Sequence, residues 1–190
     1  MRVMIGAVRR NRFFEGASRR MKAIAGLAAL LGLPMVLLAY LHSSVGTEPF
    51  PIGEMLPSLQ LASLNLDPVV LDSTGSRKLV LLFFTTECLY CKRALLNLDV
   101  LNRRYQSQVI MMGISLDGAE ETQALVAQQR PSFPVVVDLE GNVRDICRIQ
   151  GVPTLFYLDE HLVLRSRKVG VRSIEEDERD LKSFLGLEGL

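Results

Sequence analysis

The sequence predicts a mixed α/β fold in which a β-sheet is flanked by helices. From about residue 58 onward, short apolar runs alternate with stretches of helical periodicity. Two of these runs, 79–85 and 109–116, are apolar almost throughout, as is typical of strands buried between helices. Hydrophobic residues make up 48% of the 190 residues, which is enough for the core of one ordinary domain.

The first elements of this fold are an N-terminal β-hairpin, a buried strand and a helix. Strands are expected at 58–62 and 69–71, with Asp67-Pro68 as the turn between them. The apolar strand 79–85 follows, and a helix is expected over 88–105. Four residues recur on one face of this helix and are expected to be buried: Ala94, Leu95, Leu98 and Leu101.

The second half of the domain repeats the alternation and ends in a hairpin and a helix. The expected elements are strand 109–116, helix 118–129, strand 134–139, short helix 143–149, and strands 154–158 and 162–169. Pro131 and Pro134 stop the helix that begins at residue 118. Ser173 is expected to cap a last amphipathic helix that runs to about Leu185.

The N-terminal residues have a different composition from the domain. Residues 1–22 carry seven Lys or Arg against one acidic residue, whereas the rest of the chain has fifteen basic and twenty acidic residues. Residues 23–41 are uncharged and, as a helix, would reach roughly 28 Å, close to the hydrocarbon thickness of a bilayer. A retained transmembrane anchor is therefore predicted there, and a cleaved signal peptide is the alternative.

This pattern divides the chain into four parts. They are a basic cytoplasmic segment (1–22), a transmembrane anchor (23–41), a linker rich in Pro, Gly and Ser (42–57) and an α/β domain (58–190). The positive-inside rule places the domain outside the cytoplasm. Because the domain has no basic stripe or aromatic platform in its sequence, nucleic-acid binding is not expected.

Cys88-Leu89-Tyr90-Cys91 lies at the junction between the buried strand and the following helix. Two thiols at this spacing on one helical turn are close enough to form and break a disulfide. The amide groups and dipole at the start of the helix stabilise a thiolate at Cys88, the species that attacks disulfides. Half of a zinc site, or an accidental pair of cysteines on a surface helix, remain alternatives.

Four segments resemble the thioredoxin superfamily, and within it the membrane-anchored TlpA-like thiol-disulfide oxidoreductases. They are Gly53–Pro57, Lys78–Cys91, Val109–Asp117 and Gly151–Asp159, and the resemblance spans roughly residues 53–172. It implies a thioredoxin-like mixed sheet with a central αβ insertion at about 118–139. It also implies a cis Pro153 beside the dithiol, with the Val152 backbone free to pair with a substrate segment.

The same resemblance implies an activity and partners. Cys88 and Cys91 would be the catalytic residues of a protein-disulfide reductase that needs no cofactor or metal. Its domain would lie in the periplasm, anchored to the inner membrane by a single span. Its partners would be disulfide-containing envelope proteins, for example apocytochrome c, and a membrane thiol-reductant donor. The opposite direction, dithiol oxidation, uses the same atoms and stays open.

The sequence departs from the family around the dithiol. Glu87 occupies the usual Trp position, while Leu82 and Ala94 replace an Asp and a Glu that commonly handle protons. The charge of Glu87 opposes thiolate formation, and Lys92 together with Arg93 partly compensates for it.

Three other functions remain as alternatives. Thr85-Thr86-Glu87-Cys88 fits the T-x-x-C pattern of peroxiredoxin-like thiol peroxidases, in which Thr85 would help to bind peroxide. A copper chaperone resembling the Sco proteins would use His161 together with the two cysteines. A thioredoxin-fold binding module would leave the dithiol idle. Cys147 is expected in the core, with a regulatory thiol as the alternative.

Overall fold

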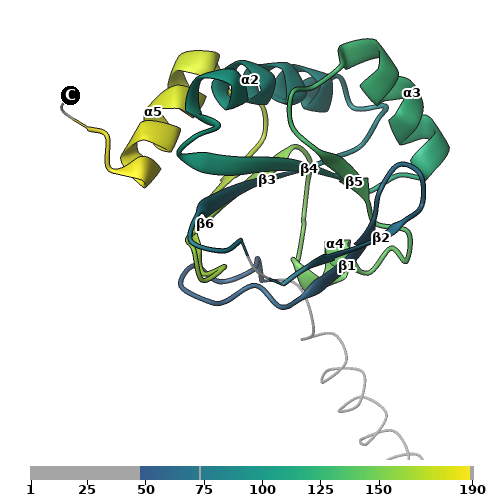
Figure 1. Cartoon of the computed structure of the whole chain (residues 1–190), viewed down its shortest axis with the longest axis horizontal. Helices are drawn as coiled ribbons and strands as arrows, with labels where there is room; N and C mark the ends of the chain where they lie inside the picture. The colour runs from purple at the N-terminus through teal and green to yellow at the C-terminus, as the bar shows by residue number, and fades with distance from the viewer. Residues whose placement is uncertain (1–47, 73, 189–190) are drawn as a thin grey trace, which may run out of the picture. The chain divides into compact units, whose positions relative to one another are not determined.

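The computed structural model describes residues 48–72 and 74–188, which form a seven-stranded mixed sheet flanked by helices (Figure 1). This architecture confirms the predicted fold class of the domain. The expected cytoplasmic segment, the anchor and the start of the linker lie outside the described residues. Within residues 48–72 and 74–188, no helix combines the length and the apolar character needed to cross a bilayer.

The sheet has the strand order β2-β1-β5-β4-β3-β6-β7. Its strands are β1 (Leu59–Ala62), β2 (Pro68–Leu71), β3 (Lys78–Phe84), β4 (Val109–Ser115), β5 (Val135–Val137), β6 (Thr154–Leu158) and β7 (Leu164–Val169). The helices are α2 (Leu89–Tyr105), α3 (Ala119–Gln129), α4 (Val143–Ile146) and α5 (Ile174–Leu185). Each corresponds to an element expected from the sequence, with ends that differ by up to three residues.

Strand β3 is central, between β4 on one side and β6 on the other. It runs parallel to β4, to which it is joined through α2, and antiparallel to β6. A parallel connection needs a long crossover, which α2 supplies, whereas the β6–β7 hairpin needs only a short turn. Near the carboxyl end of β3, Phe83 lies opposite Thr154, the first residue of β6. The segment after β3 and the segment before β6 therefore meet at one edge of the sheet.

Alternate residues of β3 serve two hydrophobic cores, one on each face of the sheet. Val80, Leu82 and Phe84 pack under α2 and α5, in the core that also contains Cys91. Leu79, Leu81 and Phe83 pack on the other face, where the core includes Phe50, Phe156 and residues of α4. Figure 1 shows α2, α3 and α5 on one side of the sheet and α4 on the other.

Part of the expected linker packs against the domain. Phe50 and Leu56 are buried in the core on the α4 face. The Gly53 N–H donates to the Leu164 carbonyl at 2.7 Å, and the Leu164 N–H donates to the Glu54 carbonyl at 2.9 Å. Two apolar side chains and a short backbone ladder thus hold this segment beside the start of β7, although its prolines and glycine indicate irregular structure.

Helix α5 has the N-terminal cap that its sequence predicts, and a buried hydrogen bond joins it to α2. The Ser173 hydroxyl accepts from the Glu176 N–H, and the Glu176 carboxylate accepts from the Ser173 N–H, which is a capping box. One residue of its inner face is polar: Asp177 is buried and accepts a hydrogen bond of 2.9 Å from Asn97 of α2. Burial raises the pKa of Asp177, although Asn97 and Arg172 act in the opposite direction. This buried contact ties α5 to the dithiol helix.

Candidate active site

Cys88 is the N-cap residue of α2, and Cys91 lies within its first turn. The Cys91 N–H donates to the Cys88 Sγ atom at 3.1 Å, which places that sulfur at the amino end of the helix. An amide donor in this position stabilises negative charge on the sulfur. The Cys88 side chain is half-buried, whereas Cys91 is fully buried, and both are free thiols. Cys88 is thus the sulfur that a second molecule can approach.

Cys91 is held in its protonated form at neutral pH. Burial and the hydrogen bond with Cys88 raise the pKa of Cys91 to about 12, although interactions with Thr85 partly oppose this. The protonated thiol of Cys91 is therefore a weak nucleophile. A base must take its proton before it can attack.

We expect iodoacetamide at pH 8 to alkylate Cys88 of the reduced native protein and to leave Cys91 and Cys147 unmodified. Burial raises the pKa of both of these thiols to about 12, so raising the pH from 7 to 9 leaves them protonated. Mass spectrometry of the digested protein measures the modification. Denatured protein is the control and should be labelled at all three cysteines; equal labelling of Cys88 and Cys91 in the native state would contradict the expectation.

The loop before β6 lies at the same edge of the sheet as the dithiol. The Val152–Pro153 peptide bond is cis, which confirms the expectation from the family resemblance. The Pro153 carbonyl accepts from the Gly170 N–H at 2.8 Å, and the Thr154 hydroxyl donates to the Gly151 carbonyl at 2.7 Å. Val152 and Cys88 both pack against the core under α2. The structure thus brings the predicted substrate loop and the dithiol together.

Asp117 supports the dithiol turn and received no role from the sequence. Its Oδ2 atom accepts from the Thr86 N–H at 2.6 Å and from the Thr86 hydroxyl at 2.7 Å. Thr86 is buried two residues before Cys88, and Asp117 follows the parallel neighbour β4. The acidic residue soon after the apolar run 109–116 is visible in the sequence, but its contact with Thr86 depends on the parallel pairing of β3 and β4, which the sequence does not show.

We expect Asp117→Ala to lower the free energy of unfolding by about 2 kcal/mol, since two hydrogen bonds to a charged acceptor are lost and Thr86 stays buried. Asp117→Asn keeps an acceptor oxygen at the same place and is expected to retain most of the stability. Urea denaturation of the two variants measures the difference. An equal loss in both would show that the carboxylate charge, and not hydrogen-bond acceptance, is what matters.

The residues expected to modulate the dithiol lie in different surroundings. Glu87 is exposed, and Lys92 is half-buried with its N–H donating to the Cys88 carbonyl at 3.1 Å. Thr85 is half-buried and hydrogen-bonds with Cys91. Leu82 and Ala94 are buried in the core under α2. The positions where the family commonly has a buried acid are therefore apolar here.

His161 and Cys147 are not brought to the dithiol. His161 is exposed in the turn after β6, whereas Pro153 precedes that strand. Because β6 separates them by its full length, His161 lies at the opposite end of the sheet, and the copper site with Cys88 and Cys91 does not form. Cys147 is fully buried in the core on the α4 face, which confirms the expectation of a core cysteine.

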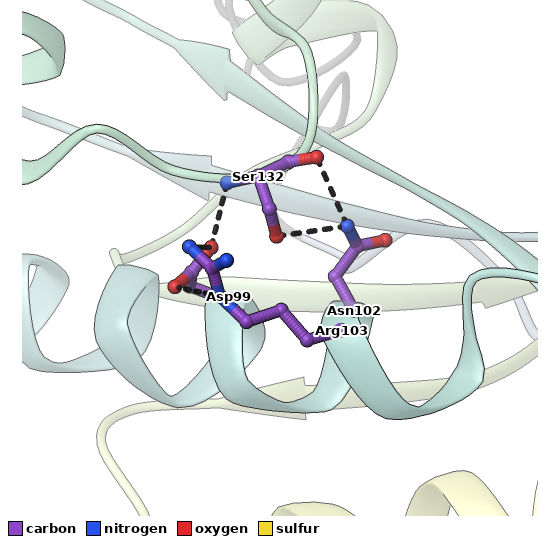
Figure 2. Close-up of polar contacts among 4 residues, drawn as sticks. All are labelled: Asp99, Asn102, Arg103 and Ser132. Atoms are coloured by element: carbon purple, nitrogen blue, oxygen red, sulfur yellow. Dashed lines mark hydrogen bonds and ion pairs between the residues drawn. The ribbon is translucent and has the colours of Figure 1, made fainter.

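Polar contacts fasten the loop between α3 and β5 to the dithiol helix (Figure 2). The Ser132 N–H donates to Asp99 at 2.6 Å, while the Asn102 side chain donates to the Ser132 carbonyl at 3.1 Å and hydroxyl at 3.0 Å. Burial acts to raise the pKa of Asp99, but hydrogen bonds from Ser132 and Arg103 outweigh this effect and lower it. This cluster lies two or more turns beyond Cys91, so it orients α2 and takes no part in the chemistry.

Comparisons with known proteins point to thiol-disulfide chemistry. Residues 52–167 match the AhpC/TSA family. The chain is 24% identical over 146 residues to "Thioredoxin-like protein YneN" of Bacillus subtilis (strain 168), covering 75% of this chain and 84% of that protein. It is 29% identical over 111 residues to "Thiol-disulfide oxidoreductase ResA" of Halalkalibacterium halodurans, covering 57% of this chain and 63% of that protein.

A solved structure supports the fold. The crystal structure of "a putative Thiol:disulfide interchange protein DsbE" from Chlorobium tepidum superposes with a TM-score of 0.67 at 21% identity. The match covers 72% of this chain and 99% of the other. At this identity the likeness concerns the fold alone.

Proposed function

Since this chain belongs to the AhpC/TSA family and is a thiol-disulfide oxidoreductase with a thioredoxin fold, we propose that its Cys88–Cys91 pair reduces disulfides of other proteins. One observation carries the proposal. The Cys88 sulfur accepts the Cys91 amide at the start of α2, and the Cys91 thiol is buried behind it. This is the arrangement of an attacking thiolate and a resolving thiol.

The reaction proceeds in two exchange steps. The Cys88 thiolate attacks one sulfur of the substrate disulfide, whose S–S bond breaks as a mixed disulfide forms and one substrate thiolate leaves. Cys91 then loses its proton and attacks the Cys88 sulfur, which releases the second substrate thiolate. Two electrons pass from the dithiol to the substrate, and a Cys88–Cys91 disulfide remains. An external dithiol donor reduces it for the next turnover.

The loop before β6 provides the docking edge for the substrate. Among the described residues, the Val152 N–H and carbonyl make no backbone hydrogen bond, and Pro153 has no N–H to donate. An extended substrate segment can therefore pair with Val152 as an added strand, with its disulfide over Cys88.

The proposed setting is the outer side of the inner membrane, in the periplasm. The uncharged run 23–41 after a basic segment supports a single anchor with the domain outside the cytoplasm. Disulfide-containing envelope proteins, for example apocytochrome c, are the proposed substrates, and a membrane thiol-reductant donor is the proposed source of electrons.

A comparison of two substrates tests the proposed function. The reduced full chain is mixed with a disulfide-bonded protein such as insulin, and separately with hydrogen peroxide. Faster reduction of the protein disulfide supports the proposal. Rapid peroxide turnover with little disulfide exchange would favour a thiol peroxidase instead. The hydrogen bond of Thr85 with Cys91, the buried thiol, supports the reductase, since a peroxidase would use Thr85 beside Cys88.

A further inference from the structure

We propose that a basic cleft beside the 151–153 loop selects substrate segments that carry an acidic side chain a few residues from the target cysteine. Arg148 and Arg167 supply its charge. This inference rests on the proposed function, since it concerns how a protein disulfide is recognised by the same site. It adds a chemical preference that the dithiol and the Val152 backbone cannot provide.

The cleft is a shallow surface depression with a volume of about 10 Å³, roughly the space of one water molecule. It begins at the residues on either side of the 151–153 loop, and none of its lining side chains is acidic. The side chains that line it include Arg148, Ile149, Gln150, Thr154, Arg167 and Val169. Two guanidinium groups in one cleft without a carboxylate favour a carboxylate from outside.

The cleft lies on the opposite face of the sheet from Cys88. Arg167 pairs across the strands with Phe156, and directly opposed residues point to the same face. Phe156 belongs to the core on the α4 face, whereas Cys88 packs against the core under α2. Val152 contacts both cores, so it lies at the edge between the two faces.

A substrate strand that pairs with Val152 can therefore reach both Cys88 and the cleft. One end presents the disulfide to Cys88, and the other continues over Val169 to the cleft. Val169 is exposed and lies opposite Thr154, beside the loop. At a rise of about 3.3 Å per residue, three or four residues of an extended segment span roughly 10 to 13 Å, which is at least the face-to-face spacing of packed sheets, so we place the acidic side chain three or four residues from the cysteine.

The side chains of Arg148 and Arg167 have different surroundings. Arg167 donates to the Phe50 carbonyl at 3.1 Å, which holds its guanidinium in place. Arg148 is exposed, and within residues 48–72 and 74–188 its side chain forms no ion pair. Lys168, the neighbour of Arg167 on β7, instead pairs with Asp180 of α5 at 3.2 Å. The free positive charge thus lies on the cleft side of the strand.

The test uses the full chain and four sets of three peptides. Each peptide carries one cysteine in a disulfide with a fluorescent thiol. Each set has Glu, Gln or Lys at one position, which lies three or four residues before or after the cysteine. We expect kcat/KM for one Glu peptide to exceed that for its Lys counterpart at least fivefold, with a smaller ratio at high salt. The variant R148A/R167A should reduce the ratio below twofold, and Arg148→Glu should invert it.

Arg144→Ala is the matched control, because Arg144 is exposed on α4 and does not line the cleft. Arg144→Ala should keep the wild-type ratio and should reduce the Gln peptide at the wild-type rate. Equal rates for the three peptides of every set would contradict the proposed selection of acidic segments by the cleft. A preference for Glu that persists in R148A/R167A and in Arg148→Glu would contradict it as well. Neither result would contradict the proposed disulfide-reductase function. If the wild type reduces no peptide, the proposed function fails and the cleft proposal fails with it.

Discussion

Cys88→Ser is expected to abolish disulfide reduction, with a loss in kcat/KM of about a thousandfold or more. Serine has a hydroxyl group in place of the thiol and cannot form a thiolate, and Cys91 cannot replace Cys88 because its side chain is fully buried and burial is the largest of the causes that raise its pKa. Initial rates of insulin reduction with purified wild type and variant measure the loss. The thiol content of the reduced variants should match the number of cysteines that remain.

Cys91→Ser is expected to stop the reaction after the first step. The mixed disulfide between Cys88 and the substrate then accumulates, since no second thiol releases it. Non-reducing electrophoresis and mass spectrometry detect the adduct and locate it on Cys88.

Cys147→Ala is the matched control for both variants. This cysteine is buried in the core on the α4 face, whereas Cys91 is buried in the core under α2. It should retain the wild-type rate and trap no substrate. A normal rate in Cys88→Ser, or an adduct formed through Cys147, would refute the assignment of the two roles.

Phe156→Ala is expected to lower the free energy of unfolding by about 3–5 kcal/mol. Phe156 is fully buried on β6, with its ring 5.0 Å from that of Phe83 in an edge-to-face arrangement and 6.1 Å from that of Phe50. Truncation leaves a cavity between the central strands and removes an aromatic pair. Urea or guanidinium denaturation measures the change in midpoint at constant slope.

Phe184→Ala provides the comparison, because Phe184 lies half-buried on α5 beside Tyr157 and the Lys78 ammonium group. Its loss should be clearly smaller, about 1–2 kcal/mol. Equal losses in the two variants would contradict the placement of Phe156 in the centre of the core.

The elements of the domain could be predicted because their signals are local. The apolar run that became β3 and the helical period of α2 identified both elements to within one residue. All four residues expected on the inner face of α2 are buried, since a period of 3.6 residues fixes which side chains share a face. The predicted helix cap is also confirmed, since Ser173 caps α5 through a capping box.

The support of the dithiol could not be predicted in the same way. Asp117 and Thr86 are 31 positions apart, and they meet because β3 and β4 pair in parallel and end at the same edge. Likewise, Phe50 and Leu56 follow a Pro- and Gly-rich pattern that indicates a linker, but they lie in the core beside residues more than 100 positions away. Neither contact has a counterpart in local periodicity or turn composition.

The sequence by itself determined the order of strands and helices, the place of the cysteine pair at the start of α2 and the family resemblance. These depend on neighbouring residues, whose spacing sets both backbone conformation and the side that is buried. Only the tertiary structure decided that Cys91 is buried behind Cys88, that Asp117 holds the turn before them, and that Arg148 and Arg167 share a cleft beside Val152. These features depend on strand pairing, which brings distant segments to one edge and sets what each side chain meets there.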